Sequence, residues 1–400
     1  MVTLIPSAPI ALSRIPTEVI IEILEFASCD GDRELDTSLL KTSSLVCRDW
    51  SIVAQKLLFR HVSLRTDAGF ASFQAAVNRS TPRSRTLADC VMRLDCVVDA
   101  KQPQGLTQAA FAKAVTMCPN LAELSLTLYG GPMPAVEGFA DEPTKGVSTP
   151  LSEETTSLLR AGPQIRSLRF DNWSGDHSAL WQLLDVWPSL TSLSLGGVHP
   201  SLPSPSQHAV RHAFTSIKLN FPTPPSADVM KALLHSSAHS LTALDIQREP
   251  SPELLQYLLT THASSLTSLA LPSCASPDRA AAVLQCTGLQ ALRIDSPGTL
   301  PSVLRGLPRT LQRLELAAAK DGAVPCLAQA VKSARALSKV TVHVGSDQER
   351  LPGLAAVRIA CAVRGVELEV SRSASATRVA PQTPAPTYTP TFSYLESYKN

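Results

Sequence analysis

The chain has 400 residues, of which 44% are hydrophobic and 18% are charged. Its 36 basic and 34 acidic residues leave a formal net charge of +2. This balance argues against a nucleic-acid-binding protein, which needs clustered Lys and Arg. No apolar run approaches the roughly 20 residues that cross a bilayer. The composition therefore predicts a globular protein with a sizeable core and no membrane association.

The amino end predicts an intracellular protein, in the cytoplasm, the nucleus or both. Residues 1–12 lack a charged n-region and are interrupted by Pro6 and Pro9, which makes a poor signal peptide. We expect this segment to be flexible. The nine cysteines are odd in number and never form a CxxC pair, so we expect neither a disulfide framework nor a zinc cluster.

Residues 13–60 predict a small helical domain. A first helix is indicated by Pro16 in its first turn, by the early Glu18 and by apolar residues at helical spacing. Asp30 and Gly31 end that helix, and a polar connection leads to a second apolar set that begins at Leu39. We expect three short helices in this segment.

The order of residues in this segment resembles the F-box family. It reads I-P-x-E-V-I-x-E-I-L, then L-x-x-x-S-L-V-C-R-D-W, then L-L-F, between Ile15 and Phe59. The resemblance implies docking on the Skp adaptor of a cullin ubiquitin ligase. Carried over by position, the docking residues are Ile15, Pro16, Ile20, Leu24, Leu45, Val46, Cys47 and Trp50. The alternative is that these residues only form the core of a helical cap.

Most of the remaining chain repeats the pattern Φ-x-x-Φ-x-Φ, in which Φ is apolar. From Ile165 onward the first apolar residue recurs every 22 to 27 residues, within the range of roughly 20–29 for leucine-rich repeats. The clear copies begin at Leu121, Leu190, Leu241, Leu266, Leu289 and Leu311. The weaker copies begin at Phe59, Val91, Ile165, Phe214, Leu337 and Val363.

Each repeat predicts a short strand, a turn and a helix, because helical spacing follows the strand pattern, for example from Pro252 to His262. Such units must stack to bury their apolar faces. We therefore expect an α/β fold in which a curved parallel sheet carries outer helices. Residues 85–370 resemble the leucine-rich repeat family, particularly the strand-plus-helix type seen in F-box proteins.

The expected repeat domain covers residues 61–370 and carries two Gly- and Pro-rich surface loops, at about 130–150 and 196–206. The Ser-, Thr- and Pro-rich segment 371–400 predicts a disordered tail. Trp181 and Trp187 lie among leucines of one predicted helix and are expected in the core.

The concave face of the predicted sheet is the candidate substrate surface. Residues that alternate with the apolar positions of a strand point away from the helices. From these positions and one adjoining turn we select Arg169, Asp171, Trp173, Lys218, Asp245, Arg293, Arg313 and Lys339 as candidate substrate-binding residues. Their mixed charges favour a protein partner. The alternative is a solvated face that binds nothing.

No motif points to catalysis, a cofactor or a metal. The histidine pairs His208/His212 and His235/His239 lack the acid of an HExxH site, and no P-loop or GxSxG signature occurs. The two resemblances imply a non-enzymatic substrate receptor of an SCF-type ubiquitin ligase, with an Skp-type adaptor, a cullin and an unidentified protein substrate as partners. The alternative is a repeat scaffold or inhibitor that recruits no ligase.

Overall fold

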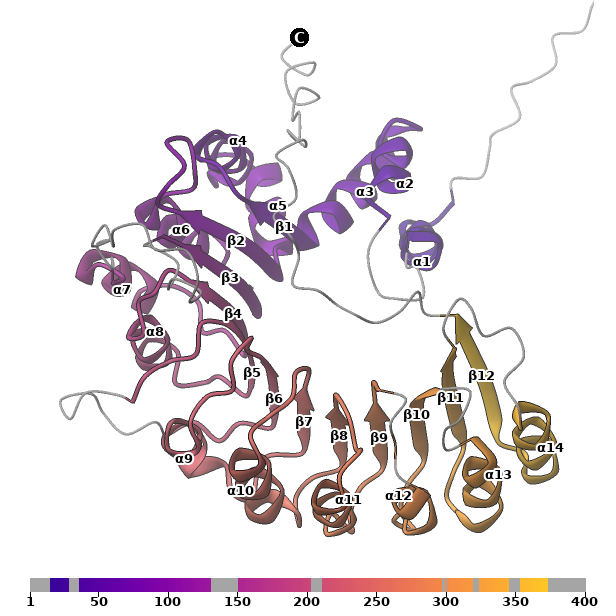
Figure 1. Ribbon diagram of the computed structural model, residues 1–400. Coiled ribbons are helices and arrows are strands. Elements are labelled where there is room, and N and C mark those ends of the chain that lie inside the picture. Colours follow the sequence, from indigo (N-terminus) through magenta and orange to yellow (C-terminus); the bar gives the residue numbers. More distant parts are fainter. Residues whose placement is uncertain are drawn as a thin grey trace, which may run out of the picture.

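The computed structural model describes residues 15–28, 36–130, 150–202, 211–296, 299, 301–318, 324–344 and 353–372. These residues form an α/β fold in which twelve parallel strands stand side by side in chain order in one curved sheet (Figure 1). The strands line the inside of the arc, and the helices that connect them cover its outside (Figure 1). The expected α/β class, with a parallel sheet and outer helices, is confirmed.

The bounds of the strands are β1 His61–Leu64, β2 Arg93–Asp99, β3 Glu123–Tyr129, β4 Ser167–Trp173, β5 Ser192–Gly197, β6 Ser216–Asn220, β7 Ala243–Ile246, β8 Ser268–Leu271, β9 Ala291–Ile294, β10 Arg313–Ala318, β11 Lys339–Val344 and β12 Glu367–Arg372.

The bounds of the α-helices are α1 Thr17–Ser28, α2 Thr37–Ser43, α3 Arg48–Arg60, α4 Asp67–Val77, α5 Pro82–Cys90, α6 Gln108–Thr116, α7 Glu153–Arg160, α8 Ala179–Val186, α9 Ala227–Leu234, α10 Pro252–His262, α11 Pro277–Leu284, α12 Pro301–Arg305, α13 Val324–Ser333 and α14 Leu354–Arg364. Among the described residues, no helix combines the length and apolarity needed to cross a bilayer.

Serine and threonine caps start many of the outer helices. The side chains of Thr107, Ser152, Ser226, Ser251 and Ser276 each accept a hydrogen bond from the backbone N–H three residues later. These bonds satisfy donors that the helix itself leaves free. The recurrent caps fix where the chain turns from the sheet edge into each helix.

A second recurrent contact joins neighbouring repeats just before their strands. The hydroxyl of Thr215 donates to the carbonyl of Thr191, at 3.1 Å. Thr242 donates in the same way to Thr215, and Thr267 donates to Thr242. The three bonds form a ladder along the amino ends of the strands, which supports the stacking of repeats that cannot bury their faces alone.

One large hydrophobic core runs between the sheet and the outer helices, and a separate small core lies within α1–α3. Trp181 and Trp187 belong to the large core, where they are 5% and 0% exposed, as expected. The small core consists of Ile20, Leu24, Leu40, Val53, Ala54 and Leu57. The amino-terminal helices therefore have a core of their own.

The expected register of the last repeat is wrong by two residues. Val340 of β11 pairs with Leu368, and Val342 pairs with Val370. Val363 instead lies on α14 and is 80% exposed. A shift of two residues keeps the same side chains on the same face of a strand, so the alternation of residues alone did not reveal it.

The expected loop at 196–206 also needs correction, because Gly196 and Gly197 belong to β5. The structure describes the chain as far as Leu202, and residues 203–210 lie outside the described residues. The expected tail 371–400 begins too early, because Ser371 and Arg372 belong to β12. The expectations for residues 1–12, for 131–149 of the first loop and for 373–400 of the tail concern segments outside the described residues.

Candidate functional site

Helix α1 carries apolar side chains on two faces. Ile20 and Leu24 are 2% and 1% exposed and belong to the small core of α1–α3. Val19, Ile23 and Phe26 follow one another at helical spacing, and Phe26 is 90% exposed. The side chains of Ile20 and Leu24 are therefore used inside the helical unit, while a second face of α1 is left open.

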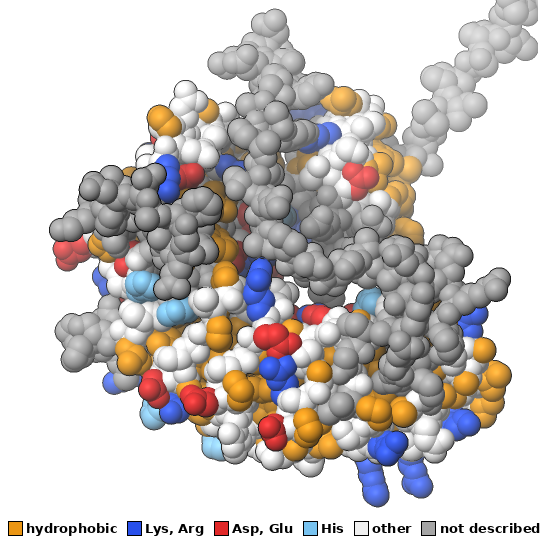
Figure 2. All heavy atoms as spheres, viewed as in Figure 1, with side chains coloured by type: hydrophobic (Ala, Val, Ile, Leu, Met, Phe, Trp, Pro, Cys, Tyr) orange, Lys and Arg blue, Asp and Glu red, His pale blue; other side chains and the backbone are white. Residues whose placement is uncertain are grey.

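The turn between α2 and α3 adds further exposed apolar side chains. Leu45 and Val46 are 66% and 63% exposed, and their backbone N–H groups bond back to the end of α2. Cys47 is exposed, while Trp50 is half-buried against the small core. At the start of α1, Ile15 and Pro16 are also exposed. Figure 2 shows hydrophobic side chains gathered over α1 and α2.

We name the exposed apolar residues Ile15, Val19, Ile23, Phe26, Leu45 and Val46 the helical apolar surface. Sequence reasoning missed Val19, Ile23 and Phe26. The signal was present, because the first helix has more large apolar residues than one buried face requires. Only the packing of α1 on α3 shows which of its faces remains open.

The candidate substrate residues line the concave face of the sheet, as the alternation of buried and exposed positions along each strand requires. Arg169, Asp171 and Trp173 lie on β4, and Trp173, which was expected in the adjoining turn, is the last residue of this strand. The guanidinium of Arg169 binds the carboxylate of Asp171 at 2.9 Å. Trp173 is half-buried and stands opposite Tyr129 of β3 in the register of the sheet.

Lys218, Asp245 and Arg293 come together in one cluster, although they belong to strands β6, β7 and β9. The carboxylate of Asp245 binds the ammonium of Lys218 at 3.2 Å and the guanidinium of Arg293 at 3.0 Å. Arg293 also binds Asp295 at 3.1 Å. Burial opposes the charge of Arg293, yet Asp245 and Asp295 raise the pKa of its guanidinium above the ordinary value.

The last strands of the sheet add a second charged group. Lys339 of β11 binds Glu367 and Glu369 of β12, at 3.2 and 2.9 Å. Hydrogen bonds from Lys339 lower the pKa of Glu369. Arg313 of β10 stands beside Lys339 in the register, is exposed and makes no ion pair with any described residue.

Acidic and basic side chains are therefore interspersed on this face, and Figure 2 shows the same mixture over the visible surface. Most cations on the concave face already have a carboxylate partner. Arg313 has no carboxylate partner among the described residues. We call the register neighbours Tyr129 and Trp173, at the carboxyl ends of β3 and β4, the aromatic pair.

The described residues contain no group of three or more His, Cys, Asp or Glu side chains that could hold a metal ion. His212 is buried and its Nε2 lies 2.9 Å from the carbonyl oxygen of Trp187. Burial raises the pKa of the Cys118 thiol to about 12 and that of Cys274 to about 11. Neither thiol is therefore ionised near neutral pH.

No model of a known protein family matches the chain, and no curated protein matches it.

Proposed function

We propose that this protein is the substrate-recognition subunit of an SCF-type ubiquitin ligase. In this proposal the helical apolar surface docks on an Skp-type adaptor, which links the chain to a cullin, and the concave face binds a protein substrate. The protein performs no chemistry itself. It acts by holding a substrate close to the enzyme that modifies it.

The observation that carries the proposal is the exposed apolar side chains on the small helical unit. Seven of the thirteen exposed large hydrophobic side chains among the described residues lie between Ile15 and Ile52. A concentration of exposed apolar side chains of this kind commonly marks a site that another protein covers. The order of residues in this same segment resembles the F-box, which supports an adaptor as the partner.

The junction between the helical unit and the sheet also supports a receptor. Helix α3 ends at Arg60 and β1 begins at His61, so no linker separates the two. Two further contacts strengthen the junction, because Arg83 of α5 donates to Gln55 of α3 at 2.8 Å, and Met92 N–H donates to the carbonyl of Arg60. A partner on the helical unit would be held at a fixed orientation to the concave face.

The proposal is tested by co-purifying the full chain with an Skp-type adaptor. Phe26→Asp places a charge at the most exposed side chain of the helical apolar surface and should weaken adaptor binding at least tenfold. Val363→Asp is the matched control, because Val363 is also largely exposed, on α14 at the other end of the sheet. It should bind as the unchanged chain does.

Two results would overturn the proposal. One is failure of the folded, unchanged chain to bind the adaptor. The other is adaptor binding that Phe26→Asp leaves intact while circular dichroism shows native helix content. The first result favours the second candidate function, a repeat scaffold or inhibitor that binds a protein without recruiting a ligase. The mixed charges and the aromatic pair of the concave face are compatible with that function.

A further inference from the structure

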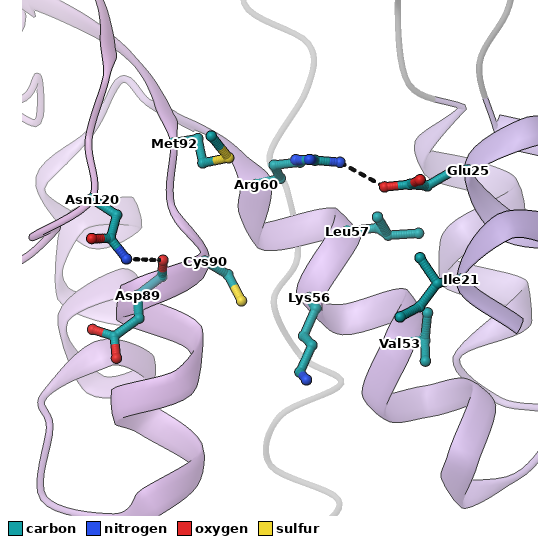
Figure 3. Close-up of a pocket in the computed structure, with 10 residues that line it drawn as sticks. All are labelled: Ile21, Glu25, Val53, Lys56, Leu57, Arg60, Asp89, Cys90, Met92 and Asn120. Atoms are coloured by element: carbon teal, nitrogen blue, oxygen red, sulfur yellow. Dashed lines mark hydrogen bonds and ion pairs between the residues drawn. The ribbon is translucent and has the colours of Figure 1, made fainter. Parts of the chain in front are cut away.

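A pocket lies at the junction between the helical unit and the first repeats of the sheet. Its volume is about 390 Å³, within the range of roughly 300–1,000 Å³ for small-molecule sites. Helices α1 and α3 form one side, and the end of α5 with the chain that follows forms the other (Figure 3). The lining residues are Ile21, Glu25, Val53, Lys56, Leu57, Arg60, Asp89, Cys90, Met92 and Asn120.

The walls of this pocket are mainly apolar. Ile21 of α1 faces Val53 and Leu57 of α3, and Met92 lies on the opposite side with the Cys90 thiol (Figure 3). An apolar wall of this kind stabilises a ligand by about 25 cal/mol for each Å² of apolar surface that it removes from water. The pocket therefore selects a ligand with an apolar body.

The charged groups of the pocket leave one cation without a partner. Glu25 is neutralised by Arg60 at 2.8 Å, and Asp89 is neutralised by Arg79 at 3.1 Å. Lys56 makes no ion pair with any described residue, and its ammonium extends into the same space as the Cys90 thiol (Figure 3). The lining residues carry two cations and two carboxylates, and Lys56 is the cation whose ammonium is not taken up by a described carboxylate. Its ammonium is therefore the group that an anionic ligand would pair with.

We propose that this junction pocket binds a small amphipathic anion, a molecule with an apolar body and a single carboxylate. The apolar body lies against Ile21, Leu57 and Met92, and the carboxylate pairs with the ammonium of Lys56. Charge complementarity favours this class over a neutral or cationic amphiphile. The proposal is independent of adaptor docking, because its residues do not belong to the helical apolar surface.

Decanoate is a suitable probe, measured with the full chain by isothermal titration calorimetry below its micelle concentration. We expect saturable binding at one site, and decylammonium, which has the same chain and the opposite charge, should bind at least tenfold more weakly. Lys56→Glu should weaken decanoate binding at least fivefold. Lys41→Glu is the matched control, since Lys41 is an exposed lysine of α2 outside the pocket. This variant should bind decanoate with the affinity of the unchanged chain.

Two cysteines provide a readout that locates the ligand. Cys90 lines the pocket, whereas Cys47 is exposed elsewhere on the helical unit. Decanoate should slow iodoacetamide alkylation of Cys90 at least threefold and leave Cys47 unchanged, as followed by peptide mass spectrometry. Phe26→Asp should preserve this protection, which distinguishes the pocket from the helical apolar surface.

Absence of decanoate binding to the folded chain would overturn the proposal. So would binding that fails to protect Cys90, or binding that Phe26→Asp abolishes, because the anion would then lie elsewhere. Equal affinity for decanoate and decylammonium would also overturn the proposal, because it would show an apolar groove that does not select an anion.

Discussion

Asp245 of β7 binds Arg293 of β9 across the intervening strand, with 3.0 Å between carboxylate and guanidinium. The residue between them in the register is Ala270 of β8, whose small side chain leaves room for the guanidinium to pass. Both partners are partly buried, with side chains 23% and 31% exposed. The contact ties three strands of the concave face together.

We expect this pair to contribute measurable coupling. In a double-mutant cycle of Asp245→Asn and Arg293→Gln, the coupling free energy from urea unfolding should be about 1 kcal/mol. The pair Asp228 and Lys231 on α9 serves as the comparison, because both of its side chains are mostly exposed. It should show no measurable coupling. Equal coupling in the two cycles would mean that burial on the concave face does not strengthen the bond.

We expect an added methyl group to lower the free energy of unfolding by very different amounts at two glycines. Gly197 at the end of β5 has φ +78°, and a Cβ there would lie 2.1 Å from the carbonyl oxygen of Asn172. Gly365 after α14 has φ +66°, with nothing within 4 Å of the Cβ position. Gly365→Ala should lower the free energy of unfolding by about 1 kcal/mol, because φ is positive at this position. Gly197→Ala should cost at least twice as much in urea unfolding, and equal costs would contradict the close approach.

The two separate cores predict that the helical unit can unfold by itself. Leu40 of α2 is fully buried in the small core, and Leu40→Ala should cost about 2–5 kcal/mol. Since a domain of this size has little stability to lose, backbone hydrogen exchange should accelerate throughout α1–α3 and remain slow in the sheet. Leu258→Ala in the large core is the control and should instead accelerate exchange around α10. Faster exchange of the whole chain in Leu40→Ala would show that the two cores unfold together.

Burial of His262 predicts a loss of stability in mild acid. Burial lowers the pKa of this imidazole below the ordinary value of 6.5. As the pH falls below 6.5, the imidazole binds a proton more readily in the unfolded chain than in the folded protein. The free energy of unfolding that is present above pH 6.5 therefore decreases as the pH falls. The thermal midpoint of unfolding should therefore decrease from pH 7 to pH 5. The thermal midpoint of the His262→Gln variant should decrease less over the same range. His235→Gln, at an exposed position, should behave as the unchanged chain does.

The sequence predicted the sheet because most strands bury two apolar positions, such as Leu244 and Ile246, while the residue between them is in most cases polar. This regularity is imposed by parallel stacking and is visible in any single repeat. The regularity was less informative at the last strand. Val366, Leu368 and Val370 allow two registers that differ by two residues and bury the same face of the strand. The left-handed turn at Gly365, which ends α14, settles the register in the structure.

The candidate surfaces were less predictable, because they depend on which side of an element packs. The positions on the concave face followed from strand alternation alone, but the cross-strand pairing of Asp245 with Arg293 needs the small Ala270 and the curvature of the sheet. On α1, the helical spacing of apolar residues did not reveal that Ile20 is buried and Ile23 is exposed. Only contact with α2 and α3 decides between them.

Because α3 runs directly into β1, the length of α3 sets how the helical unit is rotated about the α3 axis relative to the sheet. Each residue of an α-helix turns the chain by about 100°, and β1 is fixed by its pairing with β2. One residue added within α3 would therefore turn the open face of α1 by roughly a quarter of a revolution relative to the concave face. The separation between partners bound at the two surfaces would instead change by whole repeats, each about 4.8 Å along the sheet. The length of one helix thus governs the direction in which a bound partner points, and the number of repeats governs its distance.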